Sequence, residues 1–183
     1  MGDQAKASAG VKPYAESVKF RRLVSGHNEK GEAVFIEDRN CPNVFALADN
    51  PEFVVTELWR QADAPNDITS PYEDTTAGGF DINPTRNGNV FRIIEFPPNA
   101  KLGVNPDGTA AEPMKHRTAS IDYCYILEGE VYAVLDEEEK FMQKGDVLIQ
   151  RGTVHSWSNR SDKPVVILFV LCGAEPTPGM EYK

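Results

Sequence analysis

Short apolar runs separated by turn signals make up most of this 183-residue chain. The runs are rich in β-branched and aromatic residues, which favour strands, and lie at 18–24, 33–37, 53–60, 90–96, 122–127, 131–135, 147–150, 154–158 and 165–171. Between them stand turn sequences such as Glu128-Gly129-Glu130 and Lys144-Gly145-Asp146. No run of more than about ten residues shows a capped helical period. The pattern predicts an all-β chain with few helices, folded as an antiparallel sandwich or barrel.

The length of the chain suits one domain. Residues 1–16 are small or polar and are expected to form a flexible arm, followed by a single domain over 17–174 and a tail over 175–183. Residues 61–89 are rich in Pro, Gly, Asp, Asn and Thr, which predicts a long surface excursion. Two interpretations of this excursion remain open: a lid over a pocket and a surface embellishment.

Composition and charge exclude several classes of function. The net charge of −9 argues against nucleic acid as a partner, because phosphate binding needs clustered Lys and Arg. The three cysteines, Cys41, Cys124 and Cys172, form no Cys-x-x-Cys motif, and their odd number fits a reducing compartment. No segment has the roughly 20 consecutive apolar residues of a membrane span, and residues 1–16 lack an apolar targeting stretch. We therefore expect a cytoplasmic protein without a membrane partner.

The spacing of glycine, histidine and acidic residues in the second half of the chain forms a specific pattern. Asp122 precedes Gly129 by seven residues, and Gly145 precedes His155 by ten. Asn159 follows His155 by four residues. Together with His116, these spacings resemble the two signature motifs of the cupin superfamily. The resemblance implies a double-stranded β-helix, the cupin or jelly-roll barrel, with a motif core over 112–172 and extra strands at its N-terminal side.

Further segments resemble one subgroup of that superfamily. They are the sequences FRRLVSGH at 20–27 and TELWR at 56–60, together with the histidine-containing blocks at 116–123 and 150–157. The subgroup contains single-domain cupins of bacteria and of fungal polyketide gene clusters, described as cupin oxidoreductases or dehydratases. The resemblance also implies a homodimer, because cupins of this size commonly pair through their N-terminal strands.

In the cupin pattern, three histidines and one carboxylate hold a divalent metal. Here Thr118 stands at the position of the second histidine, and Asp122 replaces the more usual Glu. His116, Asp122 and His155 are therefore the candidate catalytic residues, and two interpretations remain open. They can hold one divalent ion (Fe, Mn, Ni or Zn) as a two-His-one-carboxylate set. Alternatively, they work without metal as proton-transfer groups.

Strand alternation adds candidates for the wall of a substrate pocket. Side chains two residues apart on a strand lie on the same face. Trp157 is thus expected to share a face with His155. For the same reason, Cys124 is expected to share a face with Asp122, and Trp59 is expected to share a face with Glu57. The predicted pocket residues are Thr118, Cys124, Tyr132, Trp157 and Trp59.

Three functions fit these residues. The first is an acid–base lyase or isomerase that dehydrates or decarboxylates a small, partly apolar, oxygenated substrate such as a polyketide intermediate, with His116 and His155 as acid and base. The second is a non-haem metal-dependent oxidoreductase or dioxygenase, which predicts stoichiometric iron and oxygen consumption. The third is a non-catalytic cupin that binds a small molecule.

Overall fold

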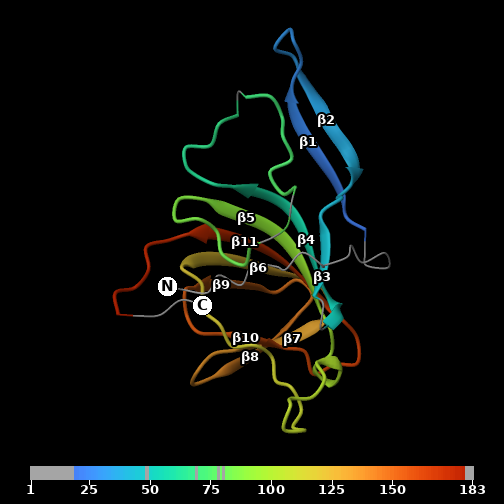
Figure 1. Ribbon diagram of the computed structural model, residues 1–183, viewed down its shortest axis with the longest axis vertical. Coiled ribbons are helices and arrows are strands. Elements are labelled where there is room, and N and C mark those ends of the chain that lie inside the picture. The colour runs from blue at the N-terminus through green and yellow to red at the C-terminus, as the bar shows by residue number, and fades with distance from the viewer. Residues whose placement is uncertain (1–18, 48–49, 69, 78, 80, 180–183) are drawn as a thin grey trace.

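Antiparallel strands form nearly all of the regular secondary structure in the computed structural model, which describes residues 19–179 apart from 48, 49, 69, 78 and 80 (Figure 1). The expectation of an all-β fold with few helices is confirmed. Among the described residues the one helical segment is η1, a 3-10 turn at Asn99–Lys101. No helix in this part of the chain is long and apolar enough to cross a membrane. The predicted arm 1–16 and residues 180–183 of the predicted tail lie outside the described residues.

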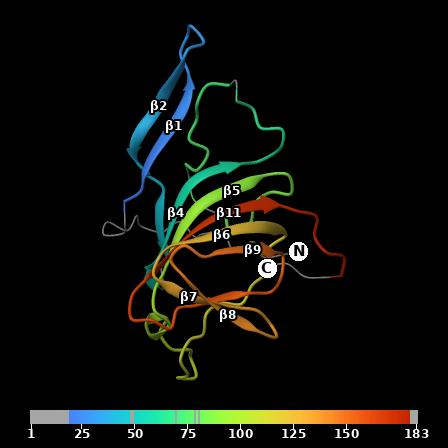
Figure 2. The same ribbon diagram turned by 180° about the vertical axis from the view of Figure 1, so that it is seen from behind.

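Two sheets face each other across the hydrophobic core (Figures 1 and 2). The larger sheet has the order β3 (Val44–Leu47), β4 (Asn50–Gln61), β5 (Asn89–Phe96), β11 (Val165–Gly173), β6 (Ser120–Glu128) and β9 (Val147–Arg151). The smaller sheet has the order β10 (Ser156–Ser158), β7 (Glu130–Val134) and β8 (Glu139–Gln143). The main core cluster draws on both sheets: Val90, Cys124, Ile126, Val131, Ala133, Met142, Trp157, Val165, Ile167, Phe169 and Leu171.

Strand β6 shows how the sequence sets the faces of the large sheet. Asp122, Cys124 and Ile126 are buried, whereas the intervening Tyr123 and Tyr125 are exposed. This alternation has the period of two that a pleated strand imposes. Gly129 follows directly with a positive φ of 81°, where an added Cβ would lie 2.9 Å from the Pro164 carbonyl oxygen. The strand alternation places the side chain of Asp122 in the interior, and the glycine permits the turn that ends the strand.

Two strands were not expected from the sequence. Strand β3 has only four residues, and β8 is largely exposed, with Met142 as its one buried side chain. Strand β3 pairs with the longer strand β4, and β8 pairs along its whole length with β7, in which Val131 and Ala133 are buried. The acidic run 136–139 lies at the β7–β8 connection, and its last residue, Glu139, opens β8.

The first two strands, β1 (Arg21–His27) and β2 (Ala33–Asn40), form a separate hairpin that projects from the sandwich (Figure 1). A buried ion cluster ties this hairpin to the 62–88 excursion. Arg22 pairs with Glu37 of β2 at 2.5 Å and with Asp74 of the excursion at 2.6 Å. Tyr72, also in the excursion, donates a hydrogen bond to Glu37 over 2.8 Å. The excursion is thus anchored on the hairpin by charged groups.

Candidate functional site

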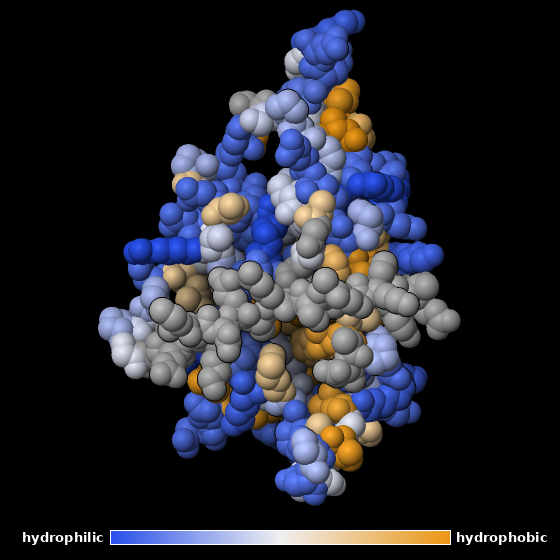
Figure 3. Space-filling model, viewed as in Figure 1, coloured by the Kyte–Doolittle hydropathy of each residue, from blue (hydrophilic) through white to orange (hydrophobic). Residues whose placement is uncertain are grey.

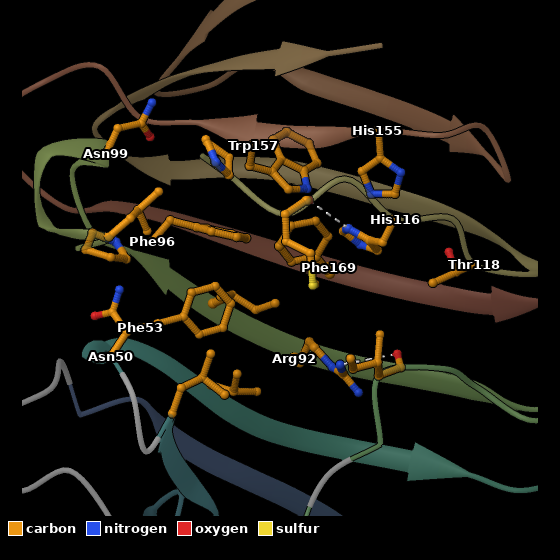
Figure 4. A pocket seen from close by; sticks show the side chains of 18 of the residues that line it. Asn50, Phe53, Arg92, Phe96, Asn99, His116, Thr118, His155, Trp157 and Phe169 are labelled. Carbon is orange, nitrogen blue, oxygen red and sulfur yellow. Dashed lines mark hydrogen bonds between the residues drawn. The ribbon is translucent and has the colours of Figure 1, made fainter. Parts of the chain in front are cut away.

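A cavity of about 300 Å³ lies against the inner face of the large sheet (Figure 4). Its walls come from strands β3 to β6, β10 and β11, the segment 97–118, and Ile82 of the long excursion. Most lining side chains are apolar, and a few polar groups join them, as in small-molecule sites generally. The lining residues are Leu47, Asn50, Phe53, Val55, Ile82, Arg92, Ile94, Phe96, Pro97, Asn99, Leu102, Ala111, Glu112, Pro113, Met114, His116, Thr118, Asp122, His155, Trp157, Phe169 and Leu171.

His116 and His155 form a cross-strand pair. They make an isolated antiparallel bridge in which each backbone N–H donates to the other residue's carbonyl oxygen, over 3.0 and 2.9 Å. Directly opposed residues in an antiparallel bridge carry their side chains on the same face. The two imidazole rings consequently lie with centroids 4.3 Å apart in the cavity wall (Figure 4). The backbone itself holds two titratable groups together.

Each ring is oriented by the backbone carbonyl two residues before it. Nδ1 of His155 lies 3.0 Å from the Thr153 carbonyl oxygen, and Nδ1 of His116 lies 3.3 Å from that of Met114. Because a carbonyl oxygen only accepts hydrogen bonds, these contacts favour the proton of each neutral ring on Nδ1. The Gln150 amide nitrogen lies 3.1 Å from the same Nδ1 of His155, but its two hydrogens are taken by the carbonyl and hydroxyl oxygens of Thr153. The Nε2 lone pair is then left to a ligand. Both histidines are thereby presented as acceptors of a proton.

The surroundings favour the uncharged form of both histidines. Burial lowers the pKa of His155 below its usual value. Burial also lowers the pKa of His116, and the nearby positive form of His155 lowers it further. Because a buried imidazolium loses its hydration and a second one beside it adds repulsion, the pair is neutral at pH 7. It is therefore set to act as base before it acts as acid.

Asp122 reaches the same cavity from β6 but is turned toward two hydroxyl groups. The Ser120 hydroxyl donates to Oδ1 over 2.6 Å, and the Thr118 hydroxyl lies 3.5 Å from Oδ2. Burial raises the pKa of Asp122, an effect that these hydroxyls and the neighbouring His116 oppose. Thr118, at the place of the family's second histidine, thus supports the carboxylate.

Arg92 is a functional candidate that the sequence analysis missed. It lies on β5 between the inward-facing Val90 and Ile94, and it is 3% exposed. Its side chain enters the polar end of the cavity (Figure 4). The available signal was a lone arginine at an inward position of an otherwise apolar strand, since arginine is almost never fully buried unless paired.

Three residues predicted for the pocket lie elsewhere. Cys124 shares the inward face with Asp122 but packs within the main core. Tyr132 faces outward on β7, where it contacts the ring of Phe141 and lies under the Arg160 guanidinium. Trp59 lies in a groove on the outer side of the large sheet and stacks on Tyr72.

The outward position of Trp59 has a local cause in strand β4. A bulge shifts the β4–β5 register at this point, so Glu57 pairs with Arg92 while Trp59 pairs with Phe91. An extra residue in one strand reverses the faces of all side chains beyond it. Glu57 is fully buried beside Arg92, and Trp59 points to the opposite face.

The fit of the site to a metal centre depends on how its donors converge. Among the residues that the structure describes, no group of three or more His, Cys, Asp or Glu side chains is placed to hold a metal ion. The two imidazoles come together, but the Asp122 carboxylate is engaged with Ser120 and Thr118. As the structure places them, His116, Asp122 and His155 do not form the two-His-one-carboxylate set that the sequence left open.

Comparison with known proteins identifies the relatives of this chain. A family model described as a cupin domain matches residues 101–171, which contain both histidines. A protein named cupin-domain-containing oxidoreductase virC, from Hypocrea virens, is 29% identical over 163 residues, or 85% of this chain and 76% of its own. Phomopsin biosynthesis cluster protein C', from Diaporthe leptostromiformis, is 33% identical over 148 residues, or 76% of this chain and 70% of its own. Among solved structures, the cupin domain of Schizosaccharomyces pombe Cnp3 gives a TM-score of 0.46 at 15% identity, covering 85% of this chain and 89% of that one.

Proposed function

The chain belongs to the cupin superfamily, and from this membership and the geometry of its cavity we propose that it is an enzyme of secondary metabolism that performs acid–base chemistry. The reaction is the dehydration, decarboxylation or isomerisation of a small, partly apolar, oxygenated substrate such as a polyketide intermediate. One observation carries the proposal: two imidazole rings, with their centroids 4.3 Å apart, share the wall of a largely apolar cavity. The names of relatives from biosynthesis clusters support the metabolic setting.

The chemistry follows from the positions of the protons. For a dehydration, Nε2 of one neutral imidazole takes a proton from the carbon next to a substrate carbonyl. The imidazolium, or the ring of its partner once the proton has crossed the pair, then protonates the departing hydroxyl group. The products are a conjugated carbonyl compound and water, and both rings return to the neutral state. Asp122 stabilises the transient positive charge, because an opposite charge nearby favours an imidazolium.

The proposal is tested with a panel of β-hydroxy ketones and β-hydroxy acids that carry a phenyl or short alkyl group. Dehydration creates a conjugated product that absorbs in the near ultraviolet. In D2O, proton abstraction is followed independently, since NMR detects deuterium entering the carbon next to the carbonyl. We expect at least one member of the panel to show both signals. If no member exchanges or dehydrates, the acid–base proposal is wrong.

The names of several relatives contain the word oxidoreductase, which favours a second candidate. We take this candidate to be a metal-dependent oxidoreductase. The two candidates differ in metal content and oxygen use. On the acid–base proposal, protein purified without chelator or added metal is expected to contain well below one Fe, Mn, Ni or Zn per chain and to consume no oxygen with the panel substrates. Elemental analysis and an oxygen electrode measure both quantities. One metal per chain that is lost in the His116→Ala variant, together with oxygen uptake, would establish the oxidoreductase instead.

We also propose that the chain forms a homodimer through its projecting hairpin. Apolar side chains show on this hairpin in the space-filling view (Figure 3), and Phe35 is 71% exposed. A groove lined partly by Leu23, Trp59 and Phe91 runs beside it along the large sheet. Exposed apolar surface of this kind marks protein interfaces. Sedimentation equilibrium is expected to give twice the chain mass of 20.3 kDa, and Phe35→Glu is expected to give the single mass. A wild-type mass of one chain would refute the dimer.

A further inference from the structure

The polar end of the cavity contains an arginine that the acid–base chemistry does not use. Arg92 projects from the inner face of β5, and its residue is 3% exposed. It lines the cavity together with the histidine pair and Thr118 (Figure 4). Burial of a guanidinium costs several kcal/mol unless other groups compensate, so the neighbours of Arg92 decide what it can do.

Neighbouring groups fix the orientation of this guanidinium. Nε of Arg92 lies 2.7 Å from Oε1 of Glu57, a buried carboxylate on the adjacent strand. Nη2 donates to the carbonyl oxygen of Asp81 over 2.5 Å, and Nη1 donates to that of Ile82 over a longer 3.4 Å. Ile82 itself lines the cavity. The long excursion thus holds the arginine in place from one side while β4 holds it from the other.

The charges around Arg92 do not cancel. Arg60 approaches the same Glu57 carboxylate, with Nη2 3.8 Å from Oε2, so two guanidinium groups flank one buried carboxylate. Burial raises the pKa of Glu57, which disfavours its negative form. The exposed Asp81 carboxylate is screened by water. The local cluster of Arg92, Arg60 and Glu57 therefore has more positive than negative groups.

We infer that Arg92 is the binding residue for a carboxylate group of the substrate. A planar guanidinium held by its neighbours matches the two oxygens of a carboxylate, and such charge-assisted bonds are stronger inside a protein than in water. The apolar part of the substrate then lies against Phe96, Trp157 and Phe169, with its reacting carbon beside the histidine pair. The substrate class is a small acid with an aromatic or alkyl body. This inference rests on the proposed function for its choice of reaction and on Arg92 for its choice of substrate.

Calorimetric titration with benzoate and benzamide tests the inference without any turnover. The two probes have nearly the same shape, but only benzoate carries a charge. We expect the wild-type chain to bind benzoate about tenfold or more tightly than benzamide. The Arg92→Gln/Glu57→Gln double variant is expected to lose this preference, because it replaces both buried charges with amides of similar size. Arg86→Gln, which alters an exposed pair with Glu175, serves as the matched control and is expected to keep the preference.

Each outcome bears on the inference. Equal affinity of the wild-type chain for the two probes, or no binding of benzoate, overturns it even if the double variant fails to fold. If the folded double variant still binds benzoate more tightly than benzamide, the inference is also overturned. If the wild-type chain prefers benzoate and the folded double variant does not, the carboxylate subsite is supported. If the same protein then neither dehydrates nor exchanges any β-hydroxy acid, the acid–base proposal fails alone and the subsite stands.

Discussion

Replacement of His155 by alanine is expected to lower kcat by about 10²- to 10⁴-fold on whichever panel substrate the wild-type chain dehydrates. His155 is buried in the cavity, and its Nδ1 is engaged with the Thr153 carbonyl, so Nε2 is the nitrogen that meets the substrate. Without the ring, no neighbouring group of similar basicity replaces it except His116. The near-ultraviolet dehydration assay measures the loss, and calorimetry on benzoate measures whether binding persists.

Two variants separate a lost base from a damaged fold. His155→Asn places an amide N–H where it can still donate to the Thr153 carbonyl, yet it offers no base. Its kcat is therefore expected to fall as far as that of His155→Ala. His27→Ala makes the alanine substitution on the exposed end of β1 and is expected to leave kcat unchanged. If the His155 and His116 variants both retain wild-type turnover while ligand affinity changes, the cavity binds its ligand without catalysis by these residues.

The pH dependence of kcat/KM provides an independent signature of the buried pair. A base must be neutral to work, and burial lowers the pKa of both His116 and His155 from the usual 6.5. The decline of kcat/KM on the acid side is therefore expected to have its midpoint below pH 6.5. In His155→Ala the repulsion that lowers the pKa of His116 is gone, so the midpoint of the residual activity is expected to shift upward. A wild-type midpoint above 6.5 would contradict a buried imidazole base.

The part of the site that lies on regular strands was predictable from the sequence. Alternation along β6 places Asp122 inward, and the histidine spacings bring His116 and His155 to one cavity. Trp157 and Thr118 also line it. These predictions depend only on the period of two and on motif spacing. The direct backbone pairing of the two histidines adds what spacing alone does not give: a ring separation and a proton assignment.

Features that depend on a single extra residue or on a distant partner were not predictable. The bulge in β4 separates Trp59 from Glu57, and no composition rule reveals which residue a bulge will skip. The inward position of Arg92 on its strand was the one signal in the sequence, whereas its partners, Glu57 and the carbonyls of Asp81 and Ile82, became known only from the structure. The anchoring of the long excursion depends on ion pairs between residues about fifty positions apart.

The largest effect on stability is expected at Arg22, where replacement by methionine should lower the free energy of unfolding by about 3–5 kcal/mol. The guanidinium is 6% exposed and pairs with Glu37 and Asp74, whose carboxylates are largely buried. Methionine has a similar length but leaves both carboxylates without their main partner, and Arg39, which is 54% exposed, compensates only in part. Urea denaturation followed by tryptophan fluorescence measures the change, with Trp59 reporting because it stacks on Tyr72 of the anchored excursion.

The neighbouring arginine on the same strand gives a matched control, since Arg21 pairs with Asp38 in an exposed position. Arg21→Met is expected to lower the free energy of unfolding far less than Arg22→Met, because solvent screens exposed ion pairs. A cost for Arg22→Met no larger than that of Arg21→Met would show that the buried cluster does not hold the hairpin and the excursion together.

Acid adds a second test of the same cluster. The hydrogen bonds from Arg22 hold the pKa of Glu37 at about 2 instead of its ordinary 4.5. Burial tends to raise the pKa of Asp74, but its hydrogen bonds from Arg22 and Thr76 keep it below the ordinary 3.8. Because the unfolded chain takes up protons at a higher pH than the folded one, this stabilisation is complete above about pH 4.5 and is lost as the pH falls toward 2. Wild-type stability should therefore decline over this interval, whereas Arg22→Met, which has already lost the interaction, should decline less. Parallel declines in the two proteins would show that Glu37 and Asp74 owe their acidity to other groups.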